Sequence, residues 1–218
     1  MSEPVRRDPT APSPAPPSGD APSSGAPVGG VLLDRDGTVC EEVGYVNHVD
    51  RVRLLPRSAA AIQVANEAGF QTVVVTNQAG VARGYFAEGL IDEAHDRVRE
   101  LLAESGARLD GIYYCPHHPE VGAPAYRKHC TCRKPSPGML ERARDEMGID
   151  LSSSYMIGDT VKDIEAGHRA GTTTVLVLTG YGKGELEYQS HAWAVHPDHV
   201  AVDLFDAVNW ILEREAAL

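Results

Sequence analysis

The chain has 218 residues, of which 42% are hydrophobic and 23% charged, and this suits a soluble single domain with a substantial core. The formal net charge of −11 argues against nucleic acid as a partner, because binding a phosphate backbone needs a basic face. No stretch approaches the roughly 18 consecutive apolar residues of a membrane span, so we expect no membrane partner either.

The first 29 residues form a region of their own, rich in proline, alanine and serine. Eight of the chain's fifteen prolines lie within residues 1–27. Such a segment buries too little apolar surface to offset its ordering entropy, so we predict a disordered tail over 1–29 and one domain over 30–218. A docking arm for a partner is the alternative. The N-terminus lacks the apolar core of a secretory signal, which favours a cytoplasmic, reducing location.

Short apolar runs rich in β-branched residues alternate with helix-like segments from residue 30 onward. The predicted strands are 31–33, 72–76, 111–115, 154–158, 173–178 and one near 192–195. The predicted helices are 57–68, 87–105, 137–147, 161–170 and 201–215. This alternation predicts an α/β, Rossmann-like parallel sheet with helices on both faces. We interpret the glycine-rich GYGKGE at 180–185 as a loop, because it lacks the third glycine of a dinucleotide fingerprint.

Two aspartates follow the first strand, in the sequence LDRDGTV of residues 33–39. Alternate residues of an extended chain point the same way, so Asp34 and Asp36 can both face the crevice at the end of the strand. Two carboxylates in one place repel each other and attract a divalent cation. An acidic turn is the structural alternative, and the buried strand before the pair favours the functional interpretation.

Polar residues also stand at the ends of the other predicted strands. Thr76 follows the second strand, where its hydroxyl could bind phosphate oxygens or cap a helix. Asp159 follows the fourth and would complete a magnesium site with Asp34 and Asp36, while Asp163 would support it from behind. Lys134 precedes the third of the helices and could hold the same phosphate. An N-cap and a surface lysine are the alternatives for Asp159 and Lys134.

Taken together, these strand ends resemble the four motifs of the haloacid-dehalogenase-like phosphohydrolases. The matching runs are DRDGT, TNQ, Lys134 and GDTVKD, and the likeness extends over residues 30 to about 215. Further runs are similar to the heptose bisphosphatase branch: GYV (44–46), VVVTNQAGVARGYF (73–86), LDGIYYCPHHP (109–119) and CTCRKPSPGML (130–140). The gaps between motifs leave no room for the large cap domain that the family often adds. The resemblance therefore implies an essentially capless phosphatase.

The resemblance also implies roles for the motif residues. Asp34 would be the nucleophile that forms an aspartyl-phosphate, and Asp36 would serve as acid and then as base. Mg²⁺ would be held by Asp34, Asp159 and, in the family, the backbone carbonyl of Asp36. Thr76 and Lys134 would hold the oxygens of the transferring phosphoryl group. One departure is Thr160, where the heptose bisphosphatases have lysine, which puts in doubt a local cation near the site.

The residues expected to contact substrate follow from the same resemblance. They are Glu42, Val43, Gly44, Tyr45, Thr76, Asn77, Gln78, Ala79, Arg83, Arg133 and Lys134. The resemblance implies a sugar bisphosphate of the heptose type as substrate and removal of its 7-phosphate, and Arg83, in the run GVARGYF, favours this branch. A histidinol-phosphate phosphatase or another small sugar-phosphate phosphatase is the nearest alternative, and a non-catalytic zinc-stabilised binding module is a remote one. Nothing in the sequence demands a dimer, so we expect a monomer.

Three of the four cysteines lie in the segment CPHHPEVGAPAYRKHCTCRKP, residues 115–135. The pattern Cys115-x-His117 with Cys130-x-Cys132 offers four soft ligands for a closed tetrahedral Zn²⁺ site, which would be structural. On proximity alone His118 and His129 are also candidates, and the resemblance selects His117. A disulfide is the alternative. The zinc would fix Arg133 and Lys134 against the substrate.

Overall fold

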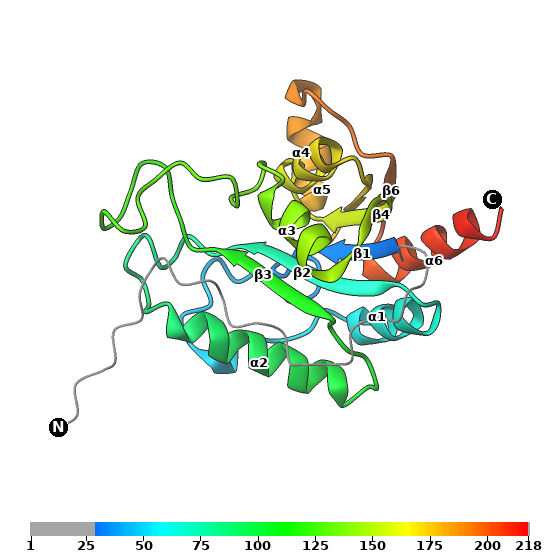
Figure 1. The fold of residues 1–218 in the computed structure, drawn as a ribbon, viewed down its shortest axis with the longest axis horizontal. Helices are drawn as coiled ribbons and strands as arrows, with labels where there is room; N and C mark the ends of the chain where they lie inside the picture. The colour runs from blue at the N-terminus through cyan, green and yellow to red at the C-terminus, as the bar shows by residue number, and fades with distance from the viewer. Residues whose placement is uncertain (1–28, 218) are drawn as a thin grey trace.

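The computed structural model describes residues 29–217, and six strands form a single sheet in it (Figure 1). The strands are β1 (Gly29–Leu33), β2 (Gln71–Asn77), β3 (Gly111–Cys115), β4 (Asp150–Gly158), β5 (Thr173–Val177) and β6 (His199–Ala201). The α-helices are α1 (Ser58–Glu67), α2 (Gly89–Ala103), α3 (Gly138–Met147), α4 (Val161–Ala170), α5 (Gly182–Gly184) and α6 (Leu204–Glu215). Short turns of 3₁₀ or π type are η1 (Val49–Arg51), η2 (Glu185–Gln189) and η3 (Ser190–Ala192).

All neighbouring strands run parallel, in the order β3-β2-β1-β4-β5-β6. The chain moves outward from β1 through β2 to β3 and then returns to β4 on the other side of β1. The order therefore reverses between β1 and β4, and a ligand crevice forms at the carboxyl ends of strands at such a point.

Helices cover both faces of the sheet, and the strand pattern explains why. Side chains of β1 alternate, so that Val31 and Leu33 join one core while Leu32 joins the other. The first core is closed by α1, α2 and α6, and the second by α3 and α4. Figure 1 shows α3 and α4 on one side of the sheet and α1 and α2 on the other. Both layers make β1 a fully buried strand, as its continuous apolar run predicts.

The predicted α/β fold is confirmed, and five of the six predicted strands lie where expected. The predicted strand near 192–195 is wrong, because η3 ends at Ala192 and the last strand, β6, lies at 199–201. Its register is set by Asp198, whose carboxylate accepts hydrogen bonds from the backbone N–H and hydroxyl of Thr174 at 2.8 and 2.9 Å. Only Ala201 of β6 is fully buried, so this strand has no apolar run from which it could be predicted.

The GYGKGE segment is also not the loop that the sequence predicted. It forms the helical turn α5 and runs directly into η2. The carboxylate of Glu185 accepts a hydrogen bond from the backbone N–H of Val161 at 2.8 Å, and so caps the first turn of α4. The predicted tail lies outside the described residues, apart from Gly29 at the start of β1. Among residues 29–217, every helix is too short or too polar to cross a membrane.

Candidate active site

The carboxyl ends of β1, β2 and β4 surround a pocket of about 260 Å³. Its lining residues are Asp34, Asp36, Glu42, Gly44, Tyr45, Asn77, Ala79, Arg133, Lys134, Asp159, Thr160, Lys162, Asp163 and Tyr181. A larger surface hollow of about 590 Å³ lies between η1 and α2, but it is lined by none of the predicted site residues. The smaller pocket is therefore the candidate active site.

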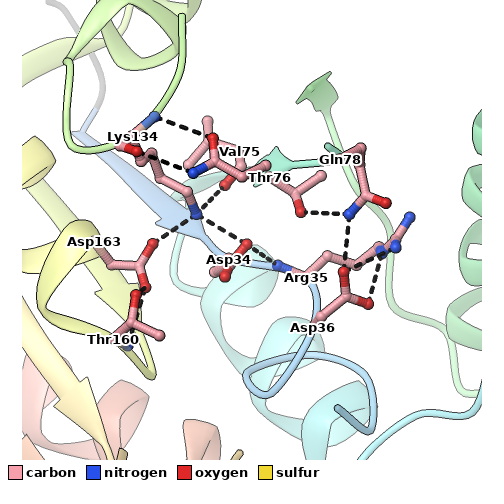
Figure 2. Close-up of polar contacts among 10 residues, drawn as sticks. Asp34, Arg35, Asp36, Val75, Thr76, Gln78, Lys134, Thr160 and Asp163 are labelled. Carbon is pink, nitrogen blue, oxygen red and sulfur yellow. Dashed lines mark hydrogen bonds and ion pairs between the residues drawn. The ribbon is translucent and has the colours of Figure 1, made fainter. Parts of the chain in front are cut away.

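Lys134 lines the pocket, and its amine lies between two carboxylates (Figure 2). Its Nζ is 2.9 Å from Oδ1 of Asp34 and 2.6 Å from Oδ1 of Asp163. It also donates a hydrogen bond to the carbonyl of Val75 at 2.7 Å. A buried ammonium is tolerated only when it is paired in this way. Lys134 therefore ties β1, β2 and α4 together beneath the pocket.

Two carboxyl groups near Lys134, those of Asp34 and Asp159, have raised pKa values. Burial, together with the charges of Asp34 and Asp163, raises the pKa of Asp159 to about 8. Burial also raises the pKa of Asp34 to about 6, although Lys134 opposes this shift. For Lys134 itself burial disfavours the charge, but its two carboxylate partners outweigh burial and raise its pKa. The charge of one lysine thus does not offset the burial of Asp34 and Asp159.

Asp34, Asp159 and Asp163 form a group that we call the carboxylate cluster. Each offers an oxygen, and these oxygens lie within 4.8 Å of one another. Hard carboxylate oxygens are the donors that Mg²⁺ takes, at about 2.1 Å, and a divalent cation would offset the burial and the mutual repulsion that raise the pKa values of Asp34 and Asp159. The cluster therefore fits Mg²⁺ chemically.

Asp163 is the member whose oxygens are most engaged with the protein. Oδ1 contacts Lys134, and Oδ2 accepts hydrogen bonds from the backbone N–H and hydroxyl of Thr160 at 3.1 and 2.7 Å. This is a capping box at the start of α4, and it explains what the threonine does in place of lysine. Asp34 and Asp159 are the freer ligands, which agrees with a supporting place for Asp163.

Two glycines allow Asp159 to lie against the end of β1. A Cβ atom on Gly37 would lie 2.0 Å from Oδ2 of Asp159, and one on Gly180 would lie 2.1 Å from the same oxygen. Both glycines also have positive φ angles, 80° and 53°. The backbone N–H of Tyr181 donates to that oxygen at 2.8 Å. The β5–α5 connection therefore fixes Asp159, a contribution that local sequence patterns do not reveal.

Asn77, at the end of β2, binds the backbone on both sides of Lys134. Its Nδ2 donates to the carbonyl of Lys134, and its Oδ1 accepts from the N–H of Lys134, both at 3.0 Å. The paired bonds hold the segment before α3 against the sheet. Asn77 thereby supports the placement of Lys134 while it also lines the pocket.

The side chain of Asp36 is turned away from the carboxylate cluster (Figure 2). Arg35 donates to it from Nε at 3.0 Å and from Nη2 at 2.8 Å. Gln78 donates from Nε2 to Oδ2 of Asp36 at 2.8 Å and to the hydroxyl of Thr76 at 3.0 Å. The carboxylate of Asp36 is therefore not a member of the cluster, which is compatible with metal binding through its backbone carbonyl only.

A second group, which we call the Cys/His cluster, joins the end of β3 to the loop that follows it: Cys115, His117, Cys130 and Cys132. Their ligand atoms, Sγ of each cysteine and Nδ1 of His117, lie within 4.8 Å of one another. The measured separations are 3.1 to 3.6 Å. A tetrahedral zinc with Zn–S bonds near 2.3 Å needs sulfur atoms about 3.7 Å apart, so the cluster fits Zn²⁺. All four cysteines of the chain are free.

The two other histidines near the cluster are not part of it. Nδ1 of His118 accepts from the backbone N–H groups of Glu120 and Val121 at 3.1 and 3.2 Å, and its Nε2 lies 3.1 Å from Nη2 of Arg83. His118 therefore shapes the loop. His129 is also outside the ligand group.

The residues expected to contact substrate divide into three groups. Glu42, Gly44, Tyr45, Asn77, Ala79, Arg133 and Lys134 line the pocket. Val43 packs at the edge of the first core, and Thr76 and Gln78 are buried at the end of β2. Arg83 lies on the exposed side of the loop, beside His118.

Sequence patterns missed one half-buried support of the Cys/His loop. The carboxylate of Glu88 accepts hydrogen bonds from the hydroxyls of Tyr114 and Tyr126, at 3.1 and 2.7 Å. Tyr114 belongs to β3 and Tyr126 to the loop, so Glu88 connects the loop to the sheet. No motif announces such a contact, because the three residues are far apart in the sequence.

Comparison with known proteins shows relatives in both sequence and fold. Residues 131–207 match the model of the HAD-hydrolase-like family. A D-glycero-D-manno-heptose-1,7-bisphosphate 7-phosphatase from Chlorobaculum tepidum is 44% identical over 185 residues, covering 82% of this chain and 92% of that protein. The D-glycero-beta-D-manno-heptose-1,7-bisphosphate 7-phosphatase of Escherichia coli K12 is 44% identical over 154 residues, covering 70% and 81%.

The chain belongs to the haloacid-dehalogenase-like phosphohydrolases of the heptose bisphosphatase type. Solved structures agree with this assignment. The crystal structure of D,D-heptose 1,7-bisphosphate phosphatase from B. bronchiseptica, in complex with magnesium and phosphate, superposes with a TM-score of 0.77 at 32% identity. It covers 86% of this chain and 99% of that chain. The family resemblance that the motifs indicated is confirmed.

Proposed function

We propose that this phosphohydrolase removes the 7-phosphate of D-glycero-D-manno-heptose 1,7-bisphosphate, with Asp34 as its nucleophile. The observation that carries the chemistry is the contact of Asp34 with the buried Lys134, at the pocket floor beside Asp159. The substrate is supported by relatives at 44% identity, which act on this heptose bisphosphate by name.

Asp34 and Asp36 supply the two reacting groups of the first half-reaction. An oxygen of Asp34 forms a bond to phosphorus as the bond to the leaving-group oxygen breaks. The leaving-group oxygen takes the electron pair of the broken bond and a proton from Asp36. The first half-reaction ends with a phosphoryl group on Asp34 and the free sugar hydroxyl.

Water completes the cycle in the second half-reaction. Asp36, now ionised, accepts a proton from a water molecule as this water attacks the phosphorus. The bond between phosphorus and Asp34 breaks, and the carboxylate and inorganic phosphate are released. When bound at the carboxylate cluster, Mg²⁺ would lower the negative charge that otherwise keeps carboxylate and phosphate apart.

Two further side chains are suited to hold the phosphoryl oxygens. Lys134 brings a positive charge to the pocket floor, and the hydroxyl of Thr76 lies at the end of β2. Thr76 accepts from Gln78, so its own hydrogen is available for a phosphate oxygen. Such preorganised donors stabilise charge that develops in the transition state.

Arg133 would contact the distal part of the substrate from the wall of the pocket. Its guanidinium donates to the carbonyl of His117 at 3.2 Å, and so is attached to the Cys/His cluster on its far side. A zinc ion in that cluster would have no open coordination position, which suits a structural role. The loop would then present Arg133 to the second phosphate of a bisphosphate.

A substrate panel tests the proposal. With Mg²⁺ present, the purified protein should release phosphate from the heptose 1,7-bisphosphate with a kcat/KM far above that for histidinol phosphate. Phosphorus NMR should show that the remaining phosphate is the one on C1. Equal or reversed kcat/KM values, or loss of the C1 phosphate, would overturn the proposed substrate.

A further inference from the structure

Arg35, between the two motif aspartates, is buried and bound to Asp36. Its Nε and Nη2 both donate to the carboxylate, in a bidentate pair at 3.0 and 2.8 Å. Gln78 adds a third donor at 2.8 Å (Figure 2). We call these two side chains the Asp36 clamp. Bidentate charge-assisted pairs of this kind fix the orientation of a carboxylate more strictly than a single bond.

Removing the carboxylate of Asp36 from the clamp would be energetically costly, because it would leave a buried charge on Arg35. Arg35 is only 2% exposed, and its Nη1 has no hydrogen-bond partner among the described residues. Burying a guanidinium is unfavourable unless a carboxylate compensates it, and Asp36 is its ion-pair partner within residues 29–217. If Asp36 leaves the clamp, Arg35 stays charged and buried without that partner. The clamp therefore draws Asp36 back.

The clamp determines how Asp36 is presented to a substrate. All three contacts come from N–H donors, and both carboxylate oxygens accept at least one of them. Asp36 also lines the pocket. The clamp therefore fixes the orientation of a carboxylate that lies beside the place where substrate would bind.

Gln78 connects the clamp to the phosphate site. The same Nε2 that donates to Asp36 also donates to the hydroxyl of Thr76 at 3.0 Å. Gln78 is itself buried, with 6% exposure, so it contacts these groups rather than solvent. A phosphate that takes the hydrogen of the Thr76 hydroxyl would strengthen the bond from Gln78, because connected hydrogen bonds polarise one another.

We propose that Arg35 and Gln78 are positioning residues that orient Asp36 for its proton transfers. The clamp holds the carboxylate in the orientation from which it serves the leaving-group oxygen in the first half-reaction and the water molecule in the second. This inference rests on the proposed function, because it assigns to Asp36 the proton transfers described above. It adds two residues that act through Asp36 and that touch neither the phosphorus nor the leaving group.

The test compares substrates that differ in their need for an acid. Phenyl phosphate has a poor leaving group that needs a proton, whereas p-nitrophenyl phosphate has a good one that does not. The variants are Arg35→Lys, which keeps the charge but loses the fork, and Gln78→Met, which keeps the volume but loses the donor. Arg99→Lys and Gln63→Met are matched controls, since both residues lie on helices away from the pocket. Thermal melting confirms folding.

The clamp variants should lose kcat/KM mainly on phenyl phosphate. A loss of about 10-fold to 100-fold is expected there, within the usual range for general acid catalysis, with a loss several-fold smaller on p-nitrophenyl phosphate. On p-nitrophenyl phosphate the variants should also release a burst of p-nitrophenol equal to the enzyme concentration. The reason is that hydrolysis of the phosphorylated enzyme, which needs Asp36 as a base, then limits turnover. The controls should match the wild type. If Arg35→Lys does not fold, Gln78→Met alone decides.

Two results would overturn the inference. An equal loss on both substrates means that the clamp only maintains structure, and unchanged kcat/KM on phenyl phosphate means that Asp36 does not need it. Failure of the proposed function is recognised separately, because the wild type would then hydrolyse neither ester or Asp34→Asn would retain activity.

Discussion

The carboxylate cluster and the Cys/His cluster are built by opposite means. Asp34 and Asp159 come from the ends of adjacent strands at the centre of the sheet, where both layers of helices hold the backbone. The Cys/His cluster lies at the edge of the sheet, where Cys115 ends β3 and the other three residues belong to the long loop that follows. The sheet backbone positions Asp34 and Asp159, whereas a metal in the Cys/His cluster would crosslink a loop to the edge strand.

The two clusters also differ in what a metal would do for them. The carboxylates carry raised pKa values and face an open pocket, so an ion there would meet substrate. The thiols and imidazole offer four ligand atoms, so a zinc ion held by all of them would have no open position. One loop residue, Arg133, links the two clusters, because its guanidinium binds the carbonyl of His117 and reaches the pocket.

Two predictions test this comparison, and the larger effect is expected from removal of one ligand of the Cys/His cluster. Cys132→Ser is expected to lose zinc and to lower kcat/KM for the heptose bisphosphate by up to about 100-fold, because Arg133 is no longer held in place. The loss should fall mainly on KM, while Mg²⁺ dependence is unchanged. Zinc content by atomic absorption and steady-state kinetics measure both quantities.

Cys40→Ser is the matched control, since Cys40 is a buried cysteine outside the Cys/His cluster. It should retain one zinc per chain and the kinetics of the wild type. A folded, zinc-free Cys132→Ser protein with the kcat/KM of the wild type would show that the loop does not need its crosslink to position Arg133.

The smaller effect concerns stability of the metal-free protein. Because the pKa of Asp159 is raised to about 8 and that of Asp34 to about 6, the folded state binds more protons than the unfolded state between about pH 4 and pH 8. Their contribution to stability is therefore lost as the pH rises. Mg²⁺ competes with these protons for the carboxylates, so the rise in Tm that Mg²⁺ causes should be larger at pH 8 than at pH 5. Each kcal/mol of added stability corresponds to about 2–4 °C in Tm for a chain of this size.

Scanning fluorimetry with and without MgCl₂ measures this shift, and NaCl of equal ionic strength serves as the reference. Asp159→Asn should remove the Mg²⁺ shift and its pH dependence together. A magnesium shift that is the same at both pH values would mean that protons and metal do not share these carboxylates.

The sequence predicted the parts of this site that local patterns determine. A buried strand followed by Asp34, and another followed by Asp159, place both carboxylates at one edge of a parallel sheet. The strand β6 escaped prediction, because its pairing depends on Asp198 and Thr174 rather than on an apolar run. Pairing between distant residues leaves no periodic signal in the sequence.

Long-range contacts also give several residues roles that could not be predicted from the sequence motifs. Gln78, expected at the substrate, is buried behind the pocket and bound to Asp36. Arg35 looks like an ordinary charged residue between two aspartates, yet it is among the most buried side chains of the protein. Charged residues are rarely buried without a partner, and only the three-dimensional structure identifies that partner as Asp36.

The most direct test of the account is to trap the phosphorylated enzyme. Acid quenching during turnover, followed by borohydride reduction and peptide mass spectrometry, should locate the modified residue at Asp34. Asp34→Asn should give no modified peptide and no turnover. Modification at another residue, or full turnover by Asp34→Asn, would contradict the assignment of Asp34 as the nucleophile beside Lys134.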